Sequence, residues 1–266
     1  MISLKTITKY FNRGSINEVL SLDNISLDVE PGDFVAIIGS NGAGKSTLLN
    51  CVAGSYLPDK GSIWLNNMDI TLWPEHKRAK FIGRVFQDPL LGTCSTLSIE
   101  QNLALAKKRG IRRGLGIGVK KRDRDLFREK LKVLGLGLEN RLQDKVGLLS
   151  GGQRQAVTMI MTTMIHPEVL LLDEHTAALD PKTANQILEL TDKIIHELKF
   201  TTLMVTHNMK QALDYGNRLI MLHMGRIIMD VRGQEKMDLT VQDLLAGFYR
   251  VQGEEFSSDK MLLVTP

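Results

Sequence analysis

The 266-residue sequence contains few cysteines and no long apolar segment. Its two cysteines, Cys51 and Cys94, are too few to suggest a disulfide framework, and we expect Cys51 to be a small buried side chain. No run approaches the roughly eighteen consecutive apolar residues of a membrane-spanning helix. The N-terminus shows no signal-peptide pattern. We therefore expect a cytoplasmic protein that does not cross a membrane.

Positive charge is gathered in one segment of the chain. The net charge is +4, and basic residues cluster at 107–109, 112–113 and 120–122. Such a cluster suits a solvated surface, which is the simplest interpretation, or anionic lipid headgroups. Because no aromatic residues alternate with the basic ones, the segment lacks the stacking platform of single-strand binders, and we expect no nucleic-acid partner.

A glycine-rich loop follows an apolar run at residues 34–38 and leads into a helical pattern. It fits G-x-x-x-x-G-K-[ST], the phosphate-binding P-loop. Glycines let the backbone N–H groups point toward phosphate oxygens, and the helix N-terminus adds its positive end. Lys45 would reach the β- and γ-phosphates, and Ser46 would offer its hydroxyl to magnesium. The predicted phosphate-binding residues are Gly39, Ser40, Asn41, Gly42, Ala43, Gly44, Lys45, Ser46 and Thr47.

Two further motifs follow in the second half of the chain. Residues 149–154 read Leu-Ser-Gly-Gly-Gln-Arg and precede an apolar, helix-compatible stretch. Four aliphatic residues at 169–172 then lead to Asp173 and Glu174. The aliphatic run indicates a buried parallel strand. Two carboxylates at its end suit a magnesium site beside a P-loop.

In this order, the motifs resemble those of the ATP-binding cassette (ABC) ATPases, from residue 1 to about residue 230. The resemblance implies ATP and Mg²⁺ as cofactors. It matches Gln87 to the family's Q-loop glutamine, Asp180 to its D-loop and His207 to its switch histidine. Phe11, with Tyr10 beside it, stands where the family places the aromatic ring that stacks on adenine.

The resemblance also assigns roles in ATP hydrolysis. Ser46 and Asp173 would hold the metal, and Gln87 would sense both metal and water. Glu174 would orient or deprotonate the attacking water. His207 would contact the γ-phosphate, whose charge Lys45 would help to offset.

One cassette cannot complete the family's catalytic site. The residues matching Ser150, Gly151, Gly152 and Gln153 cover the γ-phosphate that is bound to the P-loop of another subunit. This chain has one P-loop, one such signature and no internal repeat. We therefore expect a two-fold dimer with a second copy, or with a homologous cassette, around two ATP molecules.

Three positions depart from the family pattern. His175 stands where proline is usual, and Ala156 and Met161 stand where arginines are common. We interpret His175 as a loop substitution rather than a second catalytic base. The methionine-rich stretch at 158–164 is interpreted as core.

The predicted fold class is α/β, with a RecA-like P-loop ATPase core, an antiparallel β subdomain and an inserted helical subdomain. Residues 1–235 would form the nucleotide-binding domain, with the helical subdomain at about 88–165. Residues 236–266 would form an extension with a short helix at 241–249 and a poorly ordered tail. Strands are expected at 2–7, 19–29, 34–38, 62–65, 81–86, 169–172, 202–206, 218–222 and 226–230, and helices at 98–108, 123–134, 181–198 and from 151.

The resemblance favours the ATPase subunit of a membrane transporter, held peripherally at the cytoplasmic face of the cell membrane. Its partners would be an integral membrane permease and an extracytoplasmic substrate-binding protein. The branch suggested is an uptake type for amino acids, tryptophan among them, or similar small organic solutes. The alternative is a soluble ABC ATPase acting on ribosomes or DNA, but the chain lacks a second P-loop and sustained heptads. A P-loop kinase or GTPase would have no use for residues 149–153.

Overall fold

The computed structural model describes residues 1–111, 114 and 117–262. The chain divides into two compact units. The first unit comprises Met1–Cys51, Leu57–Thr71 and Met204–Pro266. The second comprises Val52–Tyr56 and Leu72–Leu203.

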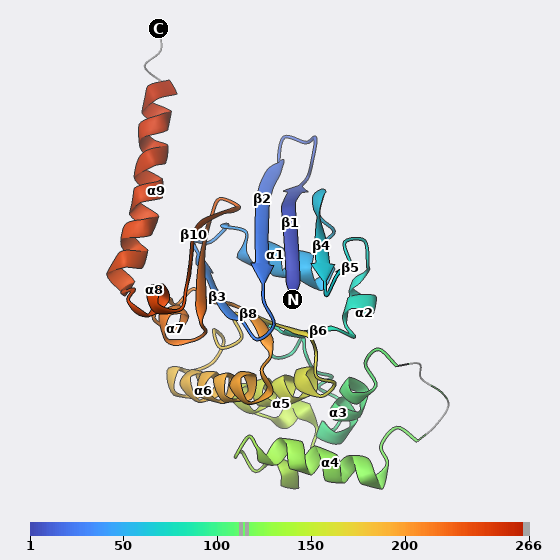
Figure 1. Cartoon of the computed structure of the whole chain (residues 1–266). Coiled ribbons are helices and arrows are strands. Elements are labelled where there is room, and N and C mark those ends of the chain that lie inside the picture. The colour runs from blue at the N-terminus through green and yellow to red at the C-terminus, as the bar shows by residue number, and fades with distance from the viewer. Residues whose placement is uncertain (112–113, 115–116, 263–266) are drawn as a thin grey trace. The chain divides into compact units, whose positions relative to one another are not determined.

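The first unit contains an antiparallel sheet that is built from β1 (Ile2–Phe11), β2 (Val19–Val29), β4 (Lys60–Leu65) and β5 (Met68–Asp69). Their order is β2-β1-β4-β5 (Figure 1). The sequence predicts the three longer strands of this sheet correctly, and the second half of β2 alternates buried and exposed positions. Strand β1 continues past the expected end at residue 7 and reaches Phe11, which brings both candidate adenine-binding aromatics onto it.

The first unit also contains β3 (Phe34–Gly39), β9 (Arg218–His223) and β10 (Arg226–Arg232). Strands β3 and β9 are parallel, and β9 and β10 form the predicted antiparallel hairpin. Residues 34–38 are at most 2% exposed, as expected for a fully buried strand. Strand β8 (Thr201–Val205) is divided between the units, and its last residues lie beside β3.

Four helices of the first unit are α1 (Lys45–Ala53, which ends in the second), α7 (Met209–Asp214), α8 (Gln234–Met237) and α9 (Val241–Leu262). Helix α9 is the long terminal helix in Figure 1. The prediction of a short helix at 241–249 is wrong, because α9 continues to Leu262. Residues 250–262 contain no proline, one glycine and several good helix formers, which explains the extension. The last four residues of the expected tail lie outside the described chain.

In the second unit, β6 (Ile82–Val85) and β7 (Val169–Asp173) form a parallel pair. Val85 lies opposite Leu172, so the two strands end at the same edge. The four aliphatic residues of β7 are at most 1% exposed. The chain segments that follow β6 and β7 therefore start side by side.

The longer helices of this unit are α3 (Ile99–Lys107), α4 (Lys121–Lys132), α5 (Gly151–Thr163) and α6 (Pro181–Leu198), with the short α2 (Glu75–Arg78) before them. All four longer helices fall within three residues of their predicted starts. Ser98 caps α3 in a reciprocal box with Gln101. Throughout the residues described, no helix is both long and apolar enough to cross a membrane.

The basic segment is only partly a solvated surface. The Lys107 ammonium contacts Asp123 at 2.6 Å, which ties α3 to α4. Arg109 donates to the backbone oxygen of Thr162 on α5 at 2.7 Å, and burial lowers the pKa of its guanidinium. Residues 120–122 are exposed, whereas 112–113 lie outside the described residues. The interpretation of a wholly solvated cluster is therefore wrong for Lys107 and Arg109, whose side chains hold helices together.

Candidate functional site

The P-loop has the strand–loop–helix form that its sequence predicts. Strand β3 ends at Gly39 and helix α1 begins at Lys45. Gly44 has a φ of +96°, and a Cβ there would lie 2.5 Å from the Ser21 backbone oxygen. A larger residue would therefore strain the backbone and also displace the neighbouring strand β2.

Lys45 is turned back onto the loop that precedes it. Its ammonium donates to the backbone oxygens of Gly39, at 2.8 Å, and Ser40, at 3.0 Å. Only 7% of the residue is exposed. A buried ammonium beside a phosphate-binding loop favours an anionic ligand, because charges interact more strongly where the local dielectric constant is low.

Two groups that the sequence did not suggest brace the P-loop. Ser21 donates its hydroxyl to Thr47 Oγ1 at 2.8 Å. The Gly225 N–H donates to the Ala43 backbone oxygen at 3.1 Å, and the Asp23 N–H donates to the Gly225 oxygen at 2.9 Å. The tip of the β9–β10 hairpin therefore connects β2 to the phosphate-binding loop.

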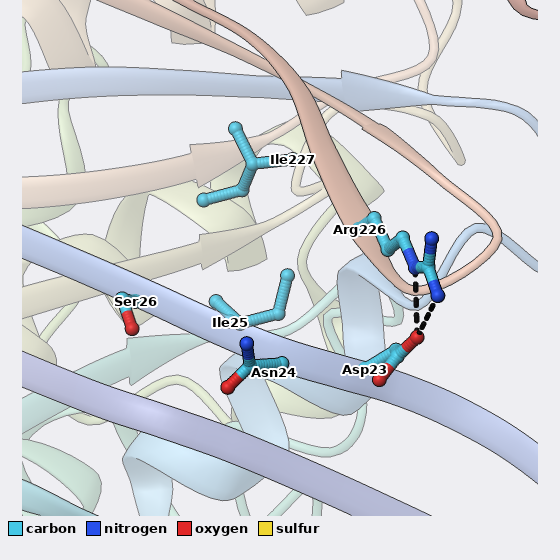
Figure 2. A pocket seen from close by; sticks show the side chains of 6 residues that line it. All are labelled: Asp23, Asn24, Ile25, Ser26, Arg226 and Ile227. Atoms are coloured by element: carbon cyan, nitrogen blue, oxygen red, sulfur yellow. Dashed lines mark hydrogen bonds and ion pairs between the residues drawn. The ribbon is translucent and has the colours of Figure 1, made fainter.

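A surface pocket of about 640 Å³ lies next to this brace. Figure 2 shows the Arg226 side chain reaching the Asp23 carboxylate, which it contacts at 2.6 Å. The ion pair neutralises both charges, and none of the predicted nucleotide-binding residues lines the pocket. We interpret it as part of the brace. The pocket is lined by Asp23, Asn24, Ile25, Ser26, Arg226 and Ile227.

The aromatic residues and His207 belong to the same unit as the P-loop. Tyr10 and Phe11 end strand β1, and both are half-buried. The guanidinium of Arg13 lies 5.4 Å from the Tyr10 ring centre. His207 is exposed and follows β8, beside Thr206, whose N–H donates to the Ile37 oxygen on β3 at 3.1 Å. The first unit therefore contains the P-loop, the aromatics and His207, and the Thr206 hydrogen bond ties the segment before His207 to β3.

The second unit brings together Gln87, Asp173 and Glu174. Gln87 follows β6, Asp173 ends β7 and Glu174 comes directly after it. The two parallel strands end at the same edge of the sheet. Glu174 has a φ of +43°. A left-handed backbone is uncommon in residues other than glycine and is found at functional sites, where the surrounding structure stabilises it.

The signature residues form the start of helix α5. Ser150 is the N-cap, and its hydroxyl accepts from the Gln153 N–H at 3.3 Å. The Gln153 side chain in turn accepts from the Ser150 N–H at 3.3 Å, so the two residues form a capping box. Gly152 faces Thr183 at the start of α6, where a Cβ would overlap the threonine methyl group.

The loop between β7 and α6 contains His175 and Asp180. Asp180 caps α6 as predicted, and its hydrogen bonds from Thr183 lower the pKa of the carboxyl. His175 is only 2% exposed, and its Nε2 lies 3.4 Å from the Thr191 hydroxyl. Burial lowers the pKa of His175 to about 4. The residue is therefore a neutral side chain that stands in the loop, as expected, but is buried in the core.

The sequence profile described as "ABC transporter" matches residues 22–177. The chain belongs to the ABC transporter family. The ATP-binding protein named for tyrosine transport in Clostridioides difficile strain R20291 is 48% identical over 250 residues, which cover 93% of this chain and 98% of the relative. The methionine import protein MetN of Corynebacterium glutamicum is 34% identical, and the match covers 85% of this chain but only 61% of MetN.

Solved structures agree with this assignment. The ATP-binding cassette MJ0796, in a dimeric post-hydrolysis state bound to ADP and phosphate, has a TM-score of 0.74 and 30% identity, covering 87% of this chain and 98% of that one. The cassette MJ1267 in its ADP conformation has a TM-score of 0.75 and 27% identity, and the match covers 91% of this chain and 95% of that one. The α/β fold with a P-loop ATPase core is confirmed. The protein is an ATPase that converts ATP and water to ADP and phosphate.

Proposed function

We propose that the protein is the ATPase subunit of an importer for tyrosine or a closely related amino acid. The observation that carries this proposal is the 48% identity to the tyrosine transport protein, which extends over 98% of that relative. The methionine relative is less similar and longer. The earlier expectation of amino-acid uptake agrees with both names, and neither relative is named for a function on ribosomes or DNA.

Magnesium fits the residues proposed to bind it. Among the residues described, no three His, Cys, Asp or Glu side chains gather as metal ligands. Magnesium in nucleotide sites takes one or two protein ligands and completes its shell with water and phosphate oxygens. The Ser46 hydroxyl and the Asp173 carboxylate would be those ligands, and Gln87, which follows the strand paired with that of Asp173, would sense the metal. Bound there, the metal would offset charge on the β- and γ-phosphates.

The chain's own residues would do the remaining work of hydrolysis. The P-loop N–H groups and Lys45 would bind the phosphates. Glu174 would accept a proton from the attacking water or orient it, and His207 would hydrogen-bond to the γ-phosphate. Phe11 and Tyr10 would provide flat surfaces for adenine.

The site would be completed by a second cassette. Ser150, Gly151 and Gly152 at the α5 N-terminus would cover the γ-phosphate held by the partner's P-loop. Gln153 and Asp180 would lie at the same interface. Support comes from MJ0796, whose cassettes form a dimer in the post-hydrolysis state.

The permease would dock on the segment that follows Gln87. Leu90 and Leu91 are 52% and 69% exposed, and Leu105 on α3 is 41% exposed. Exposed leucines in a short segment suit an apolar partner surface. The subunit would then be held at the cytoplasmic face by a permease, and a substrate-binding protein would deliver the amino acid on the other side.

An uptake assay tests the proposal. Cells that lack the gene should take up labelled tyrosine slowly, and the wild-type gene should restore uptake. A gene that encodes the Glu174→Gln variant, expressed to the same level, should not restore uptake. Excess unlabelled tyrosine should compete strongly and sulfate should not. Uptake that is unaffected by deletion, or that prefers methionine, would contradict the tyrosine assignment.

A further inference from the structure

Asp173 is held by an arginine from the neighbouring strand. Arg84 Nη2 on β6 lies 2.8 Å from Asp173 Oδ2, and each side chain is only 13% exposed. The strand register explains the contact. Arg84 lies opposite Leu171 on β7, and Asp173 is two residues further along the same strand face. Nothing in the sequence motifs assigns a role to Arg84.

The Arg84 side chain is held in position by its surroundings. Its guanidinium lies 4.7 Å from the ring centre of Phe86, within cation–π range. The Phe86 backbone oxygen accepts from Gln155 Nε2 on α5 at 3.1 Å, and Gln155 is 1% exposed. The Arg84 backbone oxygen accepts from the Thr162 hydroxyl, also on α5, at 3.2 Å. The signature helix therefore fixes the strand that presents the guanidinium and leads to Gln87.

We propose that Arg84 is a built-in counter-ion of Asp173, which magnesium must displace or weaken when it binds. The proposal rests on Asp173 being the metal ligand in the proposed function. A guanidinium and a divalent cation repel each other, and both are attracted to the same carboxylate. Arg84 therefore keeps Asp173 neutralised and oriented before the metal arrives, and it raises the magnesium concentration that nucleotide binding requires.

The counter-ion role predicts two linked changes when Arg84 is replaced. Removing one partner of a poorly exposed ion pair weakens the compensation of the other charge. The metal-free Arg84→Met protein should therefore melt at a lower temperature than wild type. Magnesium and nucleotide together should raise its melting temperature by a larger amount than they do for wild type, because the metal then supplies the missing positive charge.

The test is a magnesium titration of fluorescent ATP-analogue binding at fixed nucleotide concentration. In Arg84→Met, the half-saturating magnesium concentration should fall roughly three- to tenfold. In Arg84→Lys it should fall less, because lysine keeps the charge without the planar guanidinium. Arg128→Met is the matched control. Arg128 forms an exposed pair with Asp125, so its loss should leave the titration unchanged.

An unchanged or higher magnesium requirement in Arg84→Met would overturn the proposal. If circular dichroism shows that Arg84→Met does not fold, the magnesium requirement of Arg84→Lys replaces it, and an unchanged or higher requirement in Arg84→Lys would overturn the proposal. Asp173→Asn separates this proposal from the proposed function. If that variant needs no more magnesium than wild type, Asp173 is not the metal ligand and the site assignment fails. If Asp173→Asn needs more magnesium than wild type while Arg84→Met needs no less than wild type, only the counter-ion role of Arg84 fails.

Discussion

Replacing His175 by glutamine should make the stability of the protein less sensitive to acid. His175 is 2% exposed and contacts the Thr191 hydroxyl, and burial lowers its pKa from 6.5 to about 4. In the unfolded chain the imidazole gains a proton as the pH falls below about 6.5, whereas the folded protein keeps it neutral down to about 4. Between these values the unfolded state binds more protons, so the free energy of unfolding decreases as the pH falls.

The size of the effect follows from the two pKa values. A difference of about 2.5 pKa units corresponds to about 3 kcal/mol once the pH is below both values. At pH 5 the same arithmetic gives a loss of about 2 kcal/mol relative to pH 7.5. Glutamine cannot take up a proton, but its amide can still hydrogen-bond to Thr191. The variant should therefore lack this contribution.

Urea unfolding of both proteins at pH 7.5, 6.5 and 5.0, without nucleotide or divalent cations, measures the difference. The stability of His175→Gln relative to wild type should rise by about 2 kcal/mol between pH 7.5 and 5.0. His76→Gln, which changes an exposed histidine of the same unit, should retain the wild-type pH dependence. A wild-type-minus-variant difference that does not change with pH would refute the reasoning. At neutral pH, His175→Gln should retain most ATPase activity, since a buried imidazole with a pKa of about 4 is a weak base.

Other substitutions test the proposed site. Glu174→Gln should still bind ATP but hydrolyse it very slowly, and should elute as a dimer with ATP and magnesium in size-exclusion chromatography; a fully active monomer would exclude the assigned role. Lys45→Ala should weaken nucleotide binding by about tenfold or more, because it removes the buried cation. Ser150→Arg should leave nucleotide binding to a single chain intact but stop hydrolysis. Equal loss of nucleotide binding in both variants would contradict a site formed by two chains. Gly225→Ala should destabilise the P-loop by about 1 kcal/mol or more and weaken nucleotide binding, because its φ is +77° and a Cβ would lie 2.8 Å from the Ser21 oxygen. Gly233→Ala is the control in binding and melting assays, since Gly233 has a φ of +58° but open space where a Cβ would be added. Equal loss of nucleotide binding in both variants would contradict a role of Gly225 in bracing the P-loop.

Features that depend on residues close in sequence could be predicted. The P-loop needs a strand, a glycine-rich turn and a helix within about twenty residues, and all three follow from local patterns. The cap of α6 is equally local, since Asp180 and Pro181 carry the N-cap and N1 preferences themselves. Helix α7 was missed because it has six residues, too few for a clear apolar period, although Asn208 caps it.

Features that depend on strand register, or on how distant segments pack around a loop residue, could not be predicted. Arg84 reaches Asp173 only because β6 and β7 pair with Arg84 opposite Leu171, and a shift by one residue would turn the guanidinium to the other face. His175 follows a strand and precedes a helix, where a loop residue is the simplest expectation. Its burial depends on how α6 packs, which the sequence alone does not specify. The Gly225 contact to Ala43 likewise joins segments that are far apart in the chain.

The signature glycines have a packing role that affects how their mutants should be interpreted. The capping box already uses the Ser150 and Gln153 N–H groups within the helix terminus. The N–H groups of Gly151 and Gly152, at the first turn, are therefore those best placed to meet a phosphate of a partner cassette. A Cβ at Gly152 would also overlap Thr183, one turn after the D-loop Asp180. Loss of hydrolysis in Gly152→Ala would then follow from a displaced α6 as readily as from a blocked phosphate. Ser150→Arg, at an exposed position, does not crowd Thr183, although it removes the hydroxyl that caps α5, so its helix content should be compared with wild type by circular dichroism.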